Sequence, residues 1–179
     1  SAASDVYKRQ AYVGRAKAVQ AEEAARRAGQ GDAALLAKIR AVPGCEALTW
    51  DDVQLASTIF AVKPGDGSAR EQAASCQRVL GAGANIVTEY ATKRYRSNCI
   101  NWGMTPFLVE NPEVFALGDY IFIPGLRQAV LENKASFSAY VVKADGTVTE
   151  FPVSTGALTE PERQIIADGC LINYYRSNQ

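Results

Sequence analysis

The chain has 179 residues, of which 47% are hydrophobic and 21% charged, so it is long enough to bury a sizeable core. Its 19 basic residues balance its 19 acidic residues, which argues against DNA, RNA or an anionic membrane as a partner, because such binders carry a net basic field. Its apolar runs are all much shorter than the roughly 20 residues that a membrane span needs.

The cysteine and histidine content argues against zinc sites and against histidine-based catalysis. Cys45, Cys76, Cys99 and Cys170 are widely spaced with no CxxC pair, and the sequence has no histidine to complete a zinc site. We therefore expect four buried free thiols, no metal site in this chain, and a reducing compartment, either the cytoplasm or a mitochondrial matrix. Without histidine, a Ser-His-Asp triad and a histidine general base are excluded.

Composition divides the chain into a short tail and one domain. Residues 1–10, SAASDVYKRQ, have no apolar period and join abruptly to the alanine-rich segment after them, so we interpret them as a disordered or non-native tail. Residues 11–179 show neither an internal repeat nor a low-complexity linker and are predicted to form a single domain. Within that domain, residues 11–44 form a helical segment and residues 45–179 the core.

The helical segment is predicted to contain two helices, roughly Val13–Ala28 and Asp32–Ala41, ended by Pro43 and Gly44. Charged residues at three- and four-residue spacing should pair on its exposed face: Glu22, Glu23, Arg26 and Arg27. Few apolar side chains are available for burial, so we expect this helical hairpin to pack on the edge of the domain: Leu35, Leu36 and Ile39.

The central stretch, Leu55–Gly83, reads as strand, glycine-rich loop and helix. Leu55–Val62 is a short apolar run typical of a buried strand, and turn residues then stop it: Pro64, Gly65 and Gly67. The helix is predicted to begin at Ser68, whose hydroxyl can cap the free N–H groups of the first turn.

Such a junction favours anions. Free backbone N–H groups and the helix dipole point into the loop, and Arg70 adds a planar fork that matches a carboxylate or phosphate. The loop lacks the Lys-Ser/Thr pair of a Walker motif and the third glycine of a dinucleotide site, which disfavours nucleotides. A small carboxylate fits better, although an ordinary capped turn with a solvated arginine remains an alternative.

The next elements are a buried strand at 84–90 and a helix at 91–102. The helix carries Lys93, Arg94 and Arg96 beside tyrosines, a pattern that superficially resembles an RNA-binding surface. With zero net charge, a solvated face or a contact with other domains is the better interpretation. Beyond Pro106 we expect a strand at 119–123, a helical turn at 126–133 and a hairpin whose strands, 137–143 and 147–153, flank the turn Asp145-Gly146. A closing helix is predicted to begin at the capping box of Thr159 and Glu162 and to run through Gly169 towards Tyr175.

Three segments carry a family resemblance: GDGSAREQAA, the strand NIVTEY, and ATKRYRSNCINWGMTPF. Together they resemble the C-terminal swivelling domain of the aconitase superfamily, in which a Gly-Ser-Ser-Arg-Glu-His/Gln-Ala-Ala loop leads a helix, and a Phe-Ala-Arg-x-x-x-x-Asn helix ends in Gly-x-x-Pro. The spacing of Asn98, Gly103 and Pro106 belongs to this pattern, in which Asn98 is a buried hydrogen-bonding residue. The resemblance covers roughly residues 50–178 and is strongest to single-chain aconitate hydratases. It implies an α/β fold, the layered β/β/α swivelling domain, with a helical segment in front of it in this chain.

The resemblance also implies roles for three consecutive residues. Ser68 matches the serine that acts, as an alkoxide, on the substrate proton. Ala69 falls on a second serine that holds substrate oxygens, so only its backbone N–H can contribute to substrate binding. Arg70 matches the arginine that binds a substrate carboxylate. Lys93 and Tyr95 stand where the family has arginine and often histidine, so the second helix stays basic and aromatic.

The implied reaction is the reversible dehydration and hydration of a tricarboxylic acid such as citrate or isocitrate. The family holds a [4Fe–4S] cluster on three cysteines of upstream domains, where the iron acts as a Lewis acid, and this chain would bind none of it. We therefore expect one wall of an active site that pairs with missing N-terminal domains. The chain also lacks the family's first swivel strand and its arginine in an Arg-Ser-Asn setting, so we expect a fragment that begins inside its domain, with an open sheet edge.

Two other interpretations stay open. One is the small subunit of an isopropylmalate dehydratase-type isomerase, although the helical segment and the long closing helix make this chain less compact than such subunits. The other is a non-catalytic module that binds anions or RNA, whose affinity would fall steeply with salt.

Overall fold

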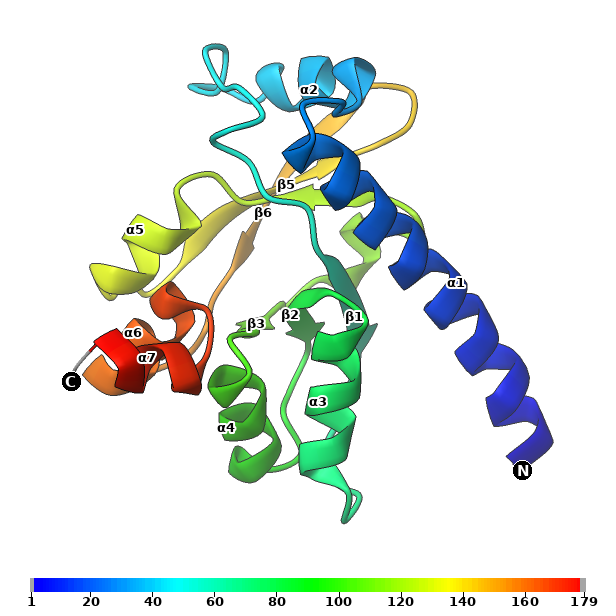
Figure 1. The fold of residues 1–179 in the computed structure, drawn as a ribbon, viewed down its shortest axis with the longest axis vertical. Helices are drawn as coiled ribbons and strands as arrows, with labels where there is room; N and C mark the ends of the chain where they lie inside the picture. Colours follow the sequence, from blue (N-terminus) through cyan, green and yellow to red (C-terminus); the bar gives the residue numbers. More distant parts are fainter. Residues whose placement is uncertain (1, 178–179) are drawn as a thin grey trace.

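The computed structural model describes the backbone of residues 2–177 and the side chains of residues 12–177 (Figure 1). The tail predicted at residues 1–10 lies outside the residues whose side chains are described. The fold is α/β, as predicted, with two small sheets and helices around them. No helix in the described part is long and apolar enough to span a membrane.

Helices and strands alternate irregularly along the chain. The first part contains α1 (Ala2–Arg27), α2 (Ala33–Arg40), β1 (Ser57–Ala61), α3 (Arg70–Val79), β2 (Ala82–Val87), α4 (Lys93–Asn101) and β3 (Thr105–Leu108). A 3-10 turn, η1 (Pro112–Val114), leads into the second part, which contains β4 (Tyr120–Phe122), α5 (Leu126–Leu131), β5 (Phe137–Val142), β6 (Val148–Val153), α6 (Glu160–Asp168) and α7 (Leu171–Ser177).

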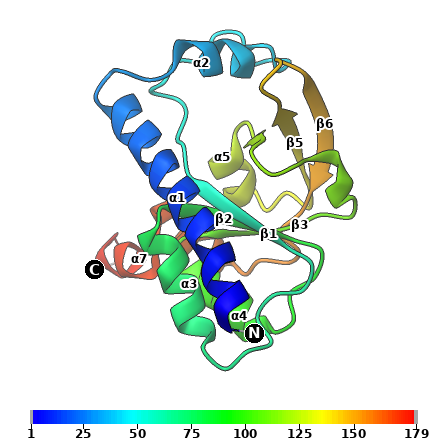
Figure 2. The ribbon, with the colours of Figure 1, turned by 90° about the vertical axis from the view of Figure 1, so that its right-hand side faces the viewer.

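The first sheet is parallel, with strand order β1-β2-β3. Each strand returns to the next through one helix, α3 and then α4, and both helices pack together on the same face of the sheet (Figures 1 and 2). β2 is the central strand and buries Asn85, Ile86 and Val87 in succession, as a strand covered on both faces must. Because all three strands run the same way, the loops that leave β1 and β2 meet at one edge.

The second sheet is antiparallel, with strand order β4-β5-β6. β5 and β6 pair from Phe137–Val153 to Val142–Val148 around the predicted Asp145-Gly146 turn. A short antiparallel bridge between Leu108 and Ser154 ties the end of β3 to the end of β6. The largest hydrophobic core lies between the two sheets and under α5 and α6: Ile86, Ile100, Phe107, Val109, Ala129, Val130, Phe137, Ala139, Val141, Phe151, Val153, Leu158 and Ile165.

The N-terminal helices pack at the margin, as predicted. α2 begins after Asp32, whose carboxylate caps it, and buries Leu35 and Ile39 against Val53. α1 runs alongside β1 and α3 (Figure 2). Of its predicted exposed pairs, Glu23 and Arg26 bond to each other but are only 13% exposed, because their side chains turn inward toward the segment before β1.

Several element predictions need correction. β1 is an edge strand, not a buried one, and its Phe60 is 42% exposed. β3 was not predicted, because Pro106 within it reads as a strand breaker; Pro106 is tolerated since β3 is the last strand of its sheet. The closing helix is in fact two helices, because Gly169 adopts a left-handed conformation that ends α6.

Candidate active site at the carboxyl edge of the parallel sheet

The loop from β1 to α3 lies at the carboxyl edge of the parallel sheet, the edge at which open α/β sheets bind ligands. In Figure 1 it is the lowest part of the molecule, next to the start of α4. Residues 66–69 of this loop are all exposed, and Arg70 is half-buried. The three candidate residues Ser68, Ala69 and Arg70 therefore occupy one accessible turn.

Ser68 does not cap the helix, contrary to the sequence prediction. α3 begins at Arg70, the N-cap residue is Ala69, and no side chain caps the first turn. Within the described part of the chain, the Ser68 hydroxyl has no hydrogen-bond partner, and the residue is exposed. The first N–H groups of α3, which have no partner inside the helix, thus remain open to solvent beside a free hydroxyl.

The Arg70 guanidinium folds back over the loop that precedes it. Its Nε donates to the Gly65 carbonyl oxygen at 3.0 Å, and its second terminal nitrogen reaches the Asp66 carbonyl oxygen at 3.4 Å. These bonds occupy the side edge of the guanidinium, which leaves its outer edge available to an anion.

A second element holds the same loop from the other side. Thr92, the N-cap of α4, donates its hydroxyl to the Gly65 carbonyl oxygen at 2.9 Å and accepts a bond from the Tyr95 N–H at 3.2 Å. The main chains of the two loops are also joined, because the Ala91 N–H donates to the Pro64 carbonyl oxygen at 2.9 Å. The loop after β1 is therefore anchored on the loop after β2.

Tyr95 lies beneath this anchor and is only 2% exposed. Its hydroxyl oxygen accepts bonds from Asn85 at 3.1 Å and from Gln77 at 3.0 Å. Asn85 also donates to the Cys99 sulfur at 3.3 Å. Burial raises the pKa of the Tyr95 hydroxyl to about 12 and that of the Cys99 thiol to about 11, so both stay neutral. Tyr95 is thus a buried support of the loop.

The prediction that Asn98 is the buried, hydrogen-bonding asparagine is wrong. Asn98 is only half-buried, and no side-chain hydrogen bond is found for it among the described residues, whereas Asn85 is fully buried. Gly103, from the same motif, has φ +74°, and a side chain there would overlap the Gly169 carbonyl. The glycine at that point of the motif thus reflects close packing between the ends of α4 and α6.

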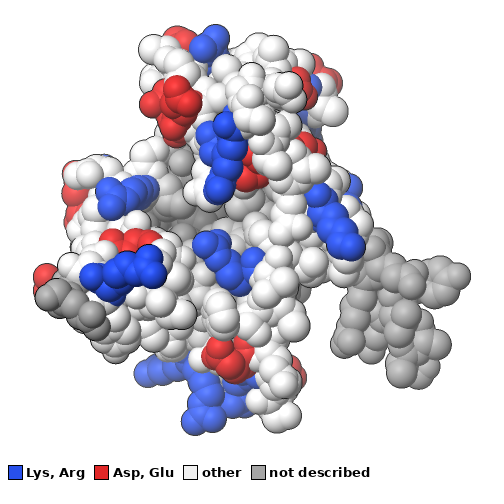
Figure 3. All heavy atoms as spheres, in the orientation of Figure 1, with Lys and Arg blue, Asp and Glu red and all other residues white. Residues whose placement is uncertain are grey.

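The basic residues of α4 divide into two groups. Lys93 and Arg94 are exposed in its first turn, and Figure 3 shows Lys and Arg side chains gathered at the lower end, where α3 and α4 begin. Arg96 instead donates to the carbonyl oxygens of Thr155 and Ala157, at 3.0 and 2.8 Å, and so joins α4 to the segment that follows β6. The acidic Asp66 and Glu71 flank the loop, and Glu71 is already bonded to Trp102.

The cysteines are free, as predicted, but only Cys45 and Cys99 are buried. Cys76 is exposed on α3, and Cys170 is half-buried between α6 and α7. Among the described residues, no group of three His, Cys, Asp or Glu side chains could hold a metal ion.

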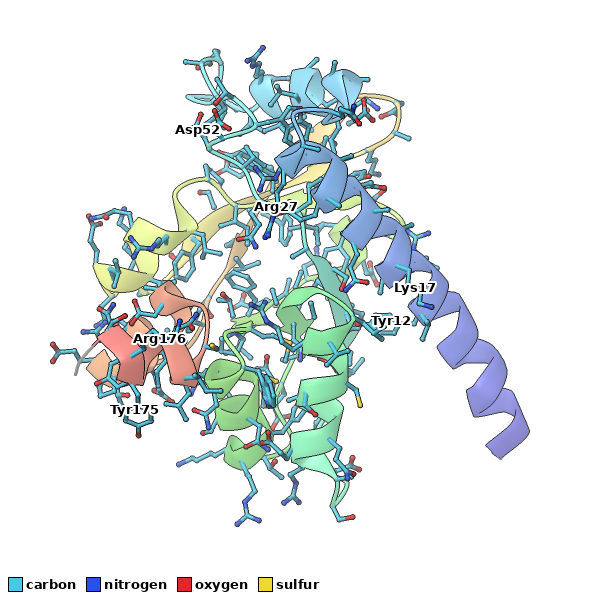
Figure 4. All side chains as sticks on the ribbon, viewed as in Figure 1. Tyr12, Lys17, Arg27, Asp52, Tyr175 and Arg176 are labelled. Carbon is cyan, nitrogen blue, oxygen red and sulfur yellow. The ribbon has the colours of Figure 1, made fainter. Side chains whose placement is uncertain are left out.

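A separate pocket of about 350 Å³ lies at the opposite end of α3, between that helix, α1 and the segment that leads into β1. Figure 3 shows a hollow on this face, and Figure 4 labels Arg27 beside it. Arg27 and Arg78 both line this pocket, while Glu23 in its wall is already bonded to Arg26, Arg27 and the Leu55 N–H. Ser68, Ala69 and Arg70 do not line this pocket. Because residues 66–69 are exposed, the candidate site is a turn on the surface.

Sequence reasoning identified the loop but missed the residues that hold it. Thr92 precedes a helix and reads as an ordinary cap, and Asn85 lies inside an apolar strand. A polar residue in a predicted central strand was the signal that could have marked Asn85, because a buried amide needs partners.

No family model matches this chain, and no curated protein matches it. The functional assignment therefore depends on the geometry of the loop and on the sequence motifs around it. That geometry places a free hydroxyl, an anchored guanidinium and unpaired helix N–H groups in one exposed turn. Chemically, such a turn can bind a carboxylate and present an oxygen base beside it.

Proposed function

We propose that this chain is the swivelling domain of an aconitase-like hydro-lyase, which removes water from a tricarboxylic acid and adds it back. The observation that supports this most directly is the exposed, unbonded Ser68 hydroxyl two residues before the anchored Arg70 guanidinium. Ala69 separates them and contributes its backbone alone.

Ser68 is proposed as the base. As an alkoxide, its oxygen takes the proton from a carbon next to a substrate carboxylate, while hydroxide leaves the neighbouring carbon and a double bond forms. A serine hydroxyl is far too weak an acid to ionise in neutral water on its own. Open N–H groups at the start of α3, the helix dipole and the Arg70 charge all stabilise the anion, which explains why such a base sits on this turn.

Arg70 is proposed to hold the carboxylate next to the carbon that loses its proton. The guanidinium presents its outer edge because the Gly65 and Asp66 carbonyls already occupy its side edge. Two parallel N–H···O bonds from that edge fix both the position and the plane of the carboxylate. Exposed Lys93 and Arg94, at the start of α4, raise the local concentration of a multiply charged acid.

The iron–sulfur cluster of the superfamily does not fit residues of this chain. The described residues offer no ligand group for a metal, so the acceptor of the leaving hydroxide is assigned to other domains. This chain then contributes proton transfer and carboxylate binding, and the carboxylate binding can be tested without the cluster.

The test is a titration of this chain with tricarballylate, a tricarboxylate that lacks the hydroxyl and cannot react, followed through backbone amide resonances. We expect the largest shifts at residues 66–72. Arg70→Gln should weaken binding about ten- to a hundredfold, the loss expected for one charge-assisted pair, while Ser68→Ala should leave it within twofold. In the enzyme that the domain completes, Ser68→Ala should lower turnover about 10²–10⁴-fold, as expected when a general base is removed.

Arg127→Gln is the matched control, because this exposed arginine bonds, among the described residues, only to the Ala167 carbonyl, far along the chain. If Arg70→Gln and Arg127→Gln weaken tricarballylate binding equally, the loss comes from the change in net charge alone, and the proposal is contradicted. Shifts confined to the pocket lined by Arg27 and Arg78 would also contradict it, by placing the carboxylate site elsewhere.

A further inference from the structure

The Gly65 carbonyl oxygen is the point at which two helices meet. Arg70 Nε, from the first turn of α3, donates to it at 3.0 Å, and the Thr92 hydroxyl, from the start of α4, donates to it at 2.9 Å. A carbonyl oxygen has two lone pairs, so these two donors use its full capacity. The position of this one oxygen therefore sets the direction of the Arg70 Nε–H bond.

Thr92 is itself held firmly. Its hydroxyl has one proton, which goes to Gly65, and it accepts the Tyr95 N–H at 3.2 Å as the cap of α4. The threonine is thus locked by bonds on both sides, and neither bond comes from α3. α4 therefore determines the orientation of the Thr92 hydroxyl, and the bond from this hydroxyl fixes the position of the Gly65 carbonyl.

The loop also packs closely against α4 at this point. Gly65 has φ +96°, and a Cβ atom at this position would lie 2.5 Å from Tyr95 Cβ and 2.6 Å from its Cγ. The tyrosine ring is held from below by bonds from Asn85 and Gln77 to its hydroxyl. The backbone of Gly65 is therefore pressed between a fixed ring and a fixed hydroxyl.

We infer that Thr92 is a positioning residue for Arg70: through the shared Gly65 carbonyl, it sets which edge of the guanidinium faces an incoming anion. With Nε and one terminal nitrogen turned to the loop carbonyls, the outer pair of N–H groups points outward as a fork. Thr92 does not touch the substrate in this scheme. The inference rests on the proposed function only for the ligand's identity as a carboxylate.

The experiment follows the Arg70 Nε–H resonance and its exchange with water in the wild-type chain and in two variants. Thr92→Val removes the hydroxyl at nearly constant volume, and Thr92→Ser restores it. We expect Thr92→Val to speed the exchange of this proton about fivefold, the effect of about 1 kcal/mol of lost hydrogen bonding, and Thr92→Ser to stay near the wild type. The affinity for tricarballylate should weaken by a similar factor in Thr92→Val alone.

Thr159→Val is the matched control, because Thr159 is also an N-cap threonine but caps α6, away from the loop. If Thr159→Val speeds the exchange of the Arg70 Nε–H as much as Thr92→Val does, the effect is general destabilisation and the inference is wrong. Unchanged exchange in a folded Thr92→Val chain would overturn it as well.

A measurement on the wild type keeps the inference testable even where Thr92→Val does not fold. Arg94 is exposed in the first turn of α4 and bonds to none of the described residues. The Nε–H of Arg70 must exchange more slowly than that of Arg94, and equal exchange would refute the shared-carbonyl arrangement. If exchange follows the expectation but tricarballylate does not bind, the proposed function fails and the positioning role stands.

Discussion

Gly65 packs directly against Tyr95, with no space between them for a side chain. A Cβ atom on Gly65 would lie 2.5 Å from Tyr95 Cβ, and the backbone there has φ +96°, a conformation that residues other than glycine rarely adopt. The contact joins the loop after β1 to the helix after β2, which are 30 positions apart in the sequence numbering. It explains why the candidate site requires glycine at this particular point of its loop.

Gly65→Ala should destabilise the chain by about 1–3 kcal/mol, because it combines a left-handed backbone with a clash against a fixed ring. Gly67→Ala in the same loop should change stability by less than about 0.5 kcal/mol, since a Cβ atom there meets nothing within 4 Å. Urea unfolding of the two variants measures the difference. Equal stabilities would show that the Gly65–Tyr95 contact is not tight in solution.

Asn85→Ala should cost about 2–3 kcal/mol. The change removes one of two donors to the Tyr95 hydroxyl, removes the bond to Cys99, and leaves a cavity beneath the parallel sheet. Asn101→Ala, at the exposed end of α4, is the control and should stay within about 0.5 kcal/mol of the wild type. Thermal or urea unfolding of both variants checks this, and a neutral Asn85→Ala would mean that the buried cluster contributes little.

Glu23 should make stability depend on pH below neutrality. Burial opposes its ionisation, but bonds from Arg26, the Leu55 N–H and Arg27 outweigh burial and lower its pKa from 4.5 to about 2. Because the folded-state pKa is lowered, the contribution is complete above pH 4.5 and is lost as the pH falls toward 2. Its size is at most roughly 3 kcal/mol at neutral pH, because solvent screens part of the interaction.

The check is urea unfolding of the wild type and Glu23→Gln at a series of pH values. The gap between them should be widest at neutral pH and should close as the pH approaches 2. A gap that is the same at pH 7 and pH 3 would show that Glu23 acts through packing alone.

Cys76 should be the thiol that reacts first in the native chain. It is exposed on α3, whereas Cys45 and Cys99 are buried, and burial raises the pKa of both buried thiols. With a disulfide reagent at pH 8, we expect one fast thiol, a slower one at Cys170, and two that react only after unfolding. Cys76→Ser should abolish the fast phase; a fast phase that persists would place an accessible thiol elsewhere.

Many local features could be predicted from the sequence because their signals are local. Asp32 caps α2, Thr159 and Glu162 form the capping box of α6, and Asp145-Gly146 turns the hairpin between β5 and β6. Each depends on residues within about four positions of one another, so neighbouring side chains are enough to specify it.

The errors arose where distant segments decide the outcome. Ser68 looked like a cap, but α3 begins after Ala69, in a loop whose Gly65 carbonyl is bonded to Arg70 and Thr92. Cys76 looked like a buried thiol, yet it lies on the solvent side of α3.

The sequence by itself determined the α/β class, most element positions and the turn that carries Ser68 and Arg70. Only the tertiary structure decided that this turn is anchored by Thr92 and Tyr95, that the Ser68 hydroxyl is left free, and that Asn85 is the buried asparagine. The physical reason is that element type follows from short-range periodicity and capping. The partners of a loop follow from which parallel strands lie side by side, and those strands are separated in the chain by whole helices.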